Sequence, residues 1–177
     1  DSLYLQPKLL LLVTLKEKFG LEIQTVHVHN GQRGAEADTD DDFVRELSEQ
    51  WKVPCLVVYR DAAAYARERG MGVEEAGREL RYEAFYEAAK ARHGARIAVA
   101  HHQVDQAETI LHNLFRGSGL KGLGGMAPVR DRVIRPLLCV GRRDIQEYLE
   151  EQGIGWRQDS TNDSTDYTRN KLRHKVI

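Results

Sequence analysis

Cysteine is scarce in this sequence. Only two of its 177 residues are cysteines, Cys55 and Cys139, and they form no CxxC pair. Cys55 lies within an apolar run and Cys139 lies beside one. Isolated cysteines in such surroundings are typical of reduced, packed thiols, and they argue against a small secreted fold built on disulfides. The sequence therefore predicts a cytoplasmic protein.

Long hydrophobic runs are also missing. The apolar cluster from Leu9 to Val13 is far shorter than the roughly 20 residues that cross a bilayer. No signal-peptide pattern surrounds it. The sequence therefore predicts no membrane span, which again favours the cytoplasm.

A large excess of charge of either sign is absent as well. The chain carries 26 Lys and Arg against 27 Asp and Glu. From Asn113 onward there are 12 basic and 8 acidic residues, whereas the residues before it carry 14 and 19. A modestly basic C-terminal part can face phosphates, but a strongly basic nucleic-acid-binding domain is excluded. The length of the chain predicts one ordinary domain, with at most a small appendage.

The order of the predicted elements indicates an α/β fold. Leu21–His29 alternates as a strand does, while Pro54–Tyr59 and the end of Arg96–His101 read as strands buried on both faces. The last of these buried strands is Ile97–Ala100, bounded by Arg96 and His101. Helical patterns follow each of them, which favours a parallel sheet wound with helices. The predicted helices are Leu9–Leu15 with Pro7 in the first turn, Glu36–Trp51, Ala62–Met71 (helical or irregular), Val73–His93, a helix from about Val104, and Gly141–Gln152. Beyond Gly125 we also expect an extended segment at Val133–Leu138, a short strand at Gly155-Trp156, a loop at Asp159–Asp166 and a basic helix start at Tyr167–Ile177.

Acidic residues crowd the start of the second predicted helix. A negative charge there is favoured by the helix dipole, so the simplest interpretation is a solvated helix start. The residues are Glu36, Asp38, Asp40, Asp41 and Asp42.

The stretch from His101 to Gly125, HHQVDQAETILHNLFRGSGLKGLGG, combines acidic side chains with a glycine-rich end. In a helix that starts near Val104, Asp105, Glu108 and His112 lie on one side. A helix end needs one glycine, and this one has five within nine residues. Each residue alone is more simply structural, but the combination is typical of an α/β ligand site. The opposite side of the helix is predicted to face a sheet through Val104, Ala107, Leu111 and Phe115.

The ends of parallel strands meet at one edge of a sheet, where ligands bind. His29–Gly34 and His101–Asp105 would share a crevice there. Arg33, Arg116 and glycine N–H groups could hold phosphate oxygens, while Asp105 and Glu108 could bind Mg²⁺, accept a proton or hold an ammonium group. These residues indicate a nucleotide or anion site and name no reaction. A transition-metal site is less favoured because the HExxH arrangement is missing; its ligands would be His101, His102, Asp105, Glu108 and His112.

The segment AHHQVDQAETILHNLFRGSGLKGLGGM resembles the central signature of the tRNA(Ile)-lysidine synthetases, close to HHxDDQAETxLxxLxRGxGxxGLxGM. Val104 replaces the first of two aspartates in that signature. VHVHNGQRG stands where the family has VHVNHGLRG, so His29 and Asn30 are transposed and Gln32 replaces leucine. Further matching blocks are DDFVRELSEQWKVP, EEAGRELRYEAFYE, IRPLL and WRQDSTNDSTDYTRNKLRHKVI, and the resemblance covers nearly the whole chain.

This resemblance implies a Rossmann-like domain with helices on both faces of a parallel sheet, as in other N-type ATP pyrophosphatases. Asp1-Ser2 would end the pyrophosphate loop SGGxDS, so the first strand and both loop glycines would be missing. The implied activity uses ATP to adenylate the C2 carbonyl oxygen of the wobble cytidine in the CAU anticodon of tRNA(Ile). The ε-amine of free lysine then displaces AMP to give lysidine.

The resemblance also implies roles for single residues. Asp1 would help to hold Mg²⁺, and Ser2 would contact pyrophosphate. Asp105 and Glu108 would hold or deprotonate the lysine amine, and Arg81 and Arg173 match active-site arginines. Without the resemblance, Arg81 would be read as a helix-surface ion pair and Arg173 as a solvated basic tail. The remaining residues expected at the nucleotide are His29, Arg33, His101, Arg116 and Gly117.

We expect residues 1–125 to form the ATP-pyrophosphatase core and residues 126–177 an extension of the catalytic domain, with the chain cut at both ends. A homodimer is left open. One alternative is another PP-loop ATPase acting on tRNA, such as a thiolase, although the absence of paired cysteines argues against sulfur transfer. The other is a nucleotide-binding module without catalysis. RNA phosphates could meet Arg116, Lys121, Arg130, Arg132, Arg135, Arg142 and Arg143, or these could be scattered surface charges.

Overall fold

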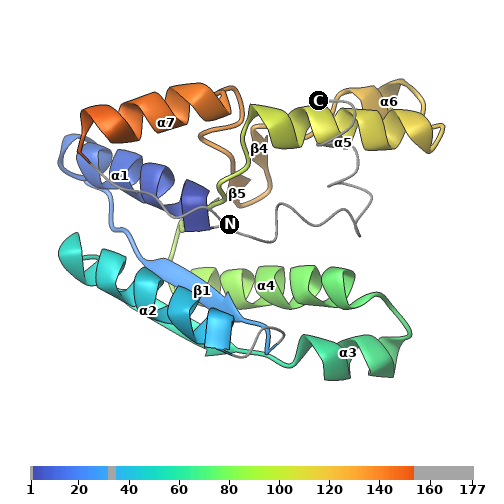
Figure 1. Ribbon diagram of the computed structural model, residues 1–177, viewed down its shortest axis with the longest axis horizontal. Helices are drawn as coiled ribbons and strands as arrows, with labels where there is room; N and C mark the ends of the chain where they lie inside the picture. Colours follow the sequence, from blue (N-terminus) through green and yellow to red (C-terminus); the bar gives the residue numbers. More distant parts are fainter. Residues whose placement is uncertain (1, 32–34, 154–177) are drawn as a thin grey trace. The chain divides into compact units, whose positions relative to one another are not determined.

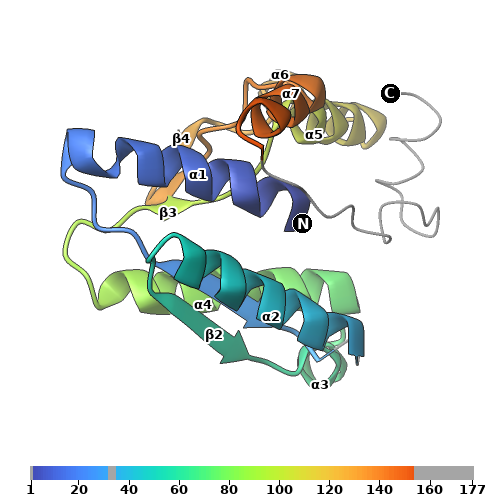
Figure 2. The same ribbon diagram turned by 60° about the vertical axis from the view of Figure 1, so that its left-hand side comes forward.

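The computed structural model describes residues 2–31 and 35–153, and it divides the chain into two compact units (Figures 1 and 2). We call residues Leu12–Ile97 the sheet unit. Asp1–Leu11 together with Ala98–Ile177 form the hairpin unit. The predicted strand at Gly155-Trp156 and the predicted loop and helix start after it lie outside the described residues.

The sheet unit is built on two parallel strands, β1 (Thr25–His29) and β2 (Cys55–Tyr59). Their register runs from Thr25 opposite Cys55 to His29 opposite Tyr59, so both strands end together. Helix α2 (Ala35–Gln50) connects them as the crossover that parallel strands require. Helices α2 and α4 (Val73–Lys90) lie on opposite faces of the pair in both views. This confirms an α/β arrangement of parallel strands and helices.

Helix α3 (Ala62–Arg69) packs against α4 and has clear signals at both ends. The Asp61 carboxylate accepts the Ala64 N–H at 2.8 Å, which satisfies one of the donors left free at a helix start. Gly70 ends the helix with φ of +64°, a conformation that glycine adopts without strain. The helical interpretation of Ala62–Met71 is confirmed.

A second, three-stranded sheet has the order β3 (Ile97–Ala98), β5 (Val133–Ile134), β4 (Val129–Arg130). It lies in the hairpin unit except for Ile97, the last residue of the sheet unit. The β4–β5 pair is antiparallel, and Asp131 turns the chain between them with φ of +53°. Around this sheet lie α5 (Gln103–Phe115), α6 (Leu120–Leu123) and α7 (Arg142–Glu151). The core of the unit is Leu137, Ile145 and Leu149, packed by Leu10, Leu11, Ala100 and Val140.

The third predicted parallel strand is not found in the β1–β2 sheet. Within the described residues, β3 is two residues long and pairs with β5, and the Val99 N–H donates to the Ile134 carbonyl at 3.0 Å. An apolar run shows that a segment is buried, but it does not name the partner strand. The predicted burial of β2 on both faces is also wrong, because Leu56 is 39% exposed and Tyr59 is 60% exposed.

Helix α1 (Ser2–Phe19) begins before the predicted start, so Pro7 lies inside it and not in a first turn near Leu9. Proline keeps a helical φ but cannot donate a hydrogen bond to the preceding turn. The leucines that follow it pack in the interior of the hairpin unit, with Leu9 buried and Leu10 and Leu11 against its core, and this packing offsets the local loss. None of the helices among the described residues is long and apolar enough to cross a membrane.

Lys8 makes the stability of the hairpin unit depend on pH. Its ammonium donates to the Ala98 carbonyl at 3.3 Å, and burial lowers the pKa of Lys8 from 10.5 to about 8. Between about pH 8 and 10.5, the unfolded chain holds the proton while the folded chain has released it. The free energy of unfolding should therefore rise with pH across this window.

We expect Lys8→Met to stabilise the protein at pH 7 by roughly 3 kcal/mol at most, because the buried charge is removed. This advantage should shrink towards pH 10.5, as measured by urea unfolding at pH 7, 8, 9 and 10. Lys16→Met, in the exposed last turn of α1, is the matched control and should leave the slope unchanged. A Lys8→Met effect that is the same at every pH would contradict this account.

Candidate functional site

The start of α5 is held by a reciprocal cap. The Asp105 carboxylate accepts the His102 backbone N–H at 2.9 Å, and the His102 Nδ1 accepts the Val104 N–H at 3.1 Å. His102 Nε2 also lies 3.4 Å from the same Asp105 oxygen, and the His102 residue is only 1% exposed. Two backbone N–H donors that the helix itself leaves without a partner are satisfied in this way. The cap fixes the Asp105 carboxylate at the beginning of the helix.

Glu108 follows Asp105 by one turn of α5 and is 4% exposed. Its neighbour Thr109 donates its hydroxyl to the Asp105 carbonyl at 2.8 Å. A buried carboxylate is uncommon, since removing a charge from water is costly. The predicted helix and the place of both acids near its start are confirmed. The predicted apolar side is wrong at Phe115, which is 67% exposed at the last turn.

The glycine-rich segment folds back onto α5. Gln106 donates its amide Nε2–H to the Met126 carbonyl at 3.1 Å and accepts the Met126 N–H through Oε1 at 2.7 Å. Asn113 Nδ2 donates to the Gly122 carbonyl at 2.9 Å. A Cβ added at Gly125 would lie 2.8 Å from the Gln106 amide, and one at Gly122 would lie 2.4 Å from Ser118 Cβ. At least these two glycines permit close packing. The number of glycines in the sequence does not tell such a packing role from ligand binding.

The parallel strands of the sheet unit bring a second group of side chains together. His29 and Tyr59 end the two strands side by side, with ring centroids 5.1 Å apart and planes tilted by 40°. His29 Nδ1 accepts the Gly31 N–H at 3.1 Å. The Arg60 N–H donates to the His29 carbonyl at 2.9 Å, so the strand ends are also tied by backbone. This is the edge at which ligands of parallel sheets bind.

Asp41 does not belong to a solvated helix start, and that prediction is wrong for this residue. It is 4% exposed, its Oδ1 lies 2.9 Å from His27 Nε2, and its Oδ2 accepts the Tyr59 hydroxyl at 3.0 Å. Burial lowers the pKa of His27, although the nearby Asp41 carboxylate opposes the shift. Nothing in the sequence indicates that Asp41 contacts His27 and Tyr59, because an acid among four others looks like a surface residue.

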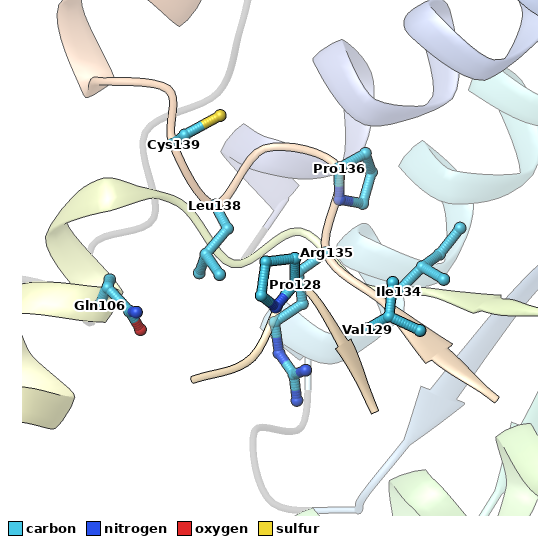
Figure 3. A pocket seen from close by; sticks show the side chains of 8 residues that line it. All are labelled: Gln106, Pro128, Val129, Ile134, Arg135, Pro136, Leu138 and Cys139. Carbon is cyan, nitrogen blue, oxygen red and sulfur yellow. The ribbon is translucent and has the colours of Figure 1, made fainter. Parts of the chain in front are cut away.

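A hollow of about 590 Å³ lies against the β4–β5 hairpin (Figure 3). Gln106 is the one lining residue that belongs to the stretch His101–Gly125, which we call the signature stretch. Neither Asp105 nor Glu108 lines the hollow. Arg135 crosses the hairpin beside it and donates Nη1–H to the Ala127 carbonyl at 2.7 Å. The other lining residues are Pro128, Val129, Ile134, Pro136, Leu138 and Cys139.

The predicted site residues fall into three groups. The hairpin unit contains those from His101 to Gly117, of which Arg116 caps the end of α5 and Gly117 follows it with φ of +72°. The sheet unit contains His29 and Arg81, the latter exposed on α4. Asp1, Arg33 and Arg173 lie outside the described residues, and Ser2 is described only as the first residue of α1. In the part of the chain that the structure describes, no three His, Cys, Asp or Glu side chains gather as a metal site.

Comparisons with known proteins agree on one family. A family model described as a PP-loop domain matches residues 1–177. Three relatives described as tRNA(Ile)-lysidine synthase, from Caldanaerobacter subterraneus, Petrotoga mobilis and Porphyromonas gingivalis, are 43%, 38% and 43% identical over 94%, 92% and 94% of this chain. The matched regions cover 36%, 52% and 37% of those relatives, so the chain spans a third to a half of their length.

A solved structure has a similar fold. It is the U34-tRNA thiolase NcsA from Methanococcus maripaludis, with its 4Fe–4S cluster. The TM-score is 0.72 at 14% sequence identity, and the match covers 96% of this chain and 61% of the thiolase. At this identity the likeness shows the fold alone.

Gly125 should tolerate no side chain. It has φ of +61°, and the added Cβ would also displace the Gln106 amide. We expect Gly125→Ala to lower the free energy of unfolding by about 2 kcal/mol or more, from backbone strain and weakened hydrogen bonds. Gly119→Ala is the matched control, because its φ is −63° and nothing lies within 4 Å of the added carbon. Equal losses in the free energy of unfolding of the two variants, measured by chemical denaturation, would refute the close packing of Gly125 against the Gln106 amide.

Proposed function

The chain belongs to the PP-loop domain family, and from this membership we propose that it is the ATP-using part of a tRNA(Ile)-lysidine synthetase. The observation that carries the proposal is the signature stretch, in which α5 holds Asp105 and Glu108 near its start. Relatives that bear this name resemble the chain over more than nine tenths of its length. The family membership implies the use of ATP.

The proposed reaction has two steps. In the first, the C2 carbonyl oxygen of the wobble cytidine in tRNA(Ile) with a CAU anticodon attacks the α-phosphorus of ATP, and pyrophosphate leaves. In the second, the ε-amine of free lysine attacks C2 of the adenylated cytidine, and AMP leaves. The amine must lose a proton on the way. The chain therefore needs a group that recruits an ammonium ion and a group that offsets the charge of pyrophosphate.

Asp105 and Glu108 supply the first need. Carboxylates attract the lysine ammonium and can accept its proton. The cap holds Asp105 in one place, and Glu108 lies one helical turn further in a buried position. A buried acid interacts more strongly with a cation than a solvated one does. The side chain of Asp105 remains 20% exposed, which leaves it accessible to a substrate.

The phosphate side of the site is assigned by resemblance and by position on the strands. We propose that Ser2 and His29 lie at the triphosphate and that Asp1 holds Mg²⁺. Mg²⁺ usually takes one or two carboxylates together with substrate phosphates, so a larger cluster of acids is not needed. The ion would help to offset the charge of the leaving pyrophosphate. The other residues assigned to the nucleotide and to charge stabilisation are Arg33, Arg81, His101, Arg116, Gly117 and Arg173.

Sulfur transfer to tRNA is the alternative function, since the fold is similar to that of a thiolase. A 4Fe–4S cluster is ordinarily held by cysteine thiolates, up to four of them. This chain contains two cysteines, Cys55 in the sheet unit and Cys139 in the hairpin unit. The residues present therefore favour lysidine synthesis. We place the protein in the cytoplasm, with residues 1–125 as the ATP-pyrophosphatase core, residues 126–177 as its extension, and tRNA(Ile) and lysine as partners.

Pyrophosphate release tests the proposed function directly. The protein should release pyrophosphate only when ATP and tRNA(Ile) with a CAU anticodon are both present, because the cytidine is the attacking group. Release is measured by a coupled phosphate assay, with tRNA(Met) that also carries CAU and an unrelated tRNA as controls. Equal release with the unrelated tRNA would favour another PP-loop activity.

Asp105→Asn should abolish lysine transfer and leave the fold intact. Asparagine keeps an oxygen that can cap the His102 N–H but carries no charge for the ammonium and accepts no proton. We expect at least a 100-fold loss of lysidine formation, an order of magnitude typical for a lost general base, followed with radiolabelled lysine.

Asp144→Asn is the matched control. Asp144 caps α7 in the same way, with its carboxylate accepting the Gly141 N–H at 3.0 Å. The control variant should transfer lysine at the normal rate. Full activity of Asp105→Asn, or an equal loss in both variants, would reject the proposed role of Asp105.

A further inference from the structure

We propose that Tyr59 and Asp41 are positioning residues of the nucleotide site, which act by holding His29 and the backbone that follows it. This inference rests on the proposed function, because it takes the end of β1 as part of the ATP site. Asp41 begins one of the matching sequence blocks, but the resemblance assigns no role to Asp41 or to Tyr59. The contacts among four side chains of the sheet unit carry the inference.

These side chains share one face of the β1–β2 pair. Residues two apart in a strand point to the same side, so His27 and His29 lie on the same face of β1. Tyr59 is the register partner of His29 on β2, which puts its ring beside the His29 ring. Asp41 reaches this face from α2, which packs against both strands. A single buried carboxylate thus connects a helix to two strands.

Tyr59 is held at both ends although it is 60% exposed. Its hydroxyl donates to Asp41 Oδ2 at 3.0 Å, and its ring contacts His29 at 5.1 Å between centroids. An exposed aromatic ring normally turns between rotamers. Anchoring the hydroxyl on a buried acid restricts that motion. Packing alone does not require such an anchor, since the ring lies mostly in solvent.

The His29 ring, which contacts Tyr59, also holds the backbone after β1. Its Nδ1 accepts the Gly31 N–H at 3.1 Å, so the ring orientation determines where that peptide group lies. Gly31 has φ of +70°, and the adjacent Asn30 carbonyl accepts the Ala62 N–H at 3.3 Å. The contacts from Asp41 through Tyr59 and His29 therefore end at the peptide group between Asn30 and Gly31, two residues after β1. That is the point from which the chain leaves the ligand-binding edge.

Phosphate groups are bound through backbone N–H groups that are already in place before the ligand arrives. If Asn30 and Gly31 are held less firmly, ATP binds more weakly in the ground state, and the chemical step is unchanged. We therefore expect Tyr59→Phe, which keeps the ring and removes the anchor, to raise the KM for ATP by roughly 3- to 10-fold, the size of one modest hydrogen bond. The kcat should stay within about twofold.

Tyr65→Phe is the matched control. Tyr65 also lies in the sheet unit and donates its hydroxyl to a carboxylate, Glu79 Oε2 at 3.2 Å, but this bond joins α3 to α4 and involves neither His29 nor Gly31. Three quantities are measured for the wild type and both variants. They are the KM and kcat for ATP in pyrophosphate release, the dissociation constant for ATP by calorimetry, and the exchange rate of the Gly31 amide by NMR.

Faster Gly31 exchange and weaker ATP binding in Tyr59→Phe, with neither change in Tyr65→Phe, is the expected result. Unchanged Gly31 exchange would overturn the inference, as would faster exchange with unchanged ATP affinity. A lower melting temperature with unchanged KM would show a purely structural role and would also overturn it. Failure of the wild type to use tRNA(Ile) would instead refute the proposed function, and ATP affinity with Gly31 exchange would still decide the positioning role.

Discussion

The cap between His102 and Asp105 is the interaction on which the signature stretch depends. It combines a histidine that is 1% exposed with a carboxylate that accepts the His102 backbone N–H at 2.9 Å. Because the cap fixes where α5 begins, it also fixes Glu108 one turn later and Gln106 opposite the glycine-rich segment. An acid that serves as a helix cap is already oriented when a substrate arrives. In the reaction proposed above, the same side chain would cap the helix and bind the lysine ammonium.

Much of the fold was predictable from periodicity and end signals. Helix α7 was expected at Gly141–Gln152 and lies at Arg142–Glu151, and α5 was expected to start near Val104 and starts at Gln103. The amphipathic pattern is a local property and is legible in one sequence. The partner of β3 was not predictable, since strand pairing is set by tertiary contacts that an apolar run does not encode. Pro7 inside α1 shows the same limit, because packing overrides local preference.

The candidate site was predicted unevenly for a related physical reason. Asp105 and Glu108 stand out because their spacing places two acids on one helix side. The sequence predicts Asp41 at the surface, because its burial depends on His27 and Tyr59, which lie 14 and 18 residues away in sequence. The glycines were counted as ligand-binding, although Gly122 and Gly125 are close against side chains of the hairpin unit. In these cases the burial and packing of a residue depend on partners distant in sequence, which the residue type does not reveal.

The bond pair between Gln106 and Met126 has a consequence for how the hairpin unit opens. It joins two points that are 20 residues apart, so the intervening chain forms a closed ring of helix and loop. Within that ring, Asn113 makes a further hydrogen bond to the Gly122 carbonyl. Segments tied in this manner open together and not residue by residue. We therefore expect the end of α5, helix α6 and the glycine-rich segment to unfold locally as one cooperative unit.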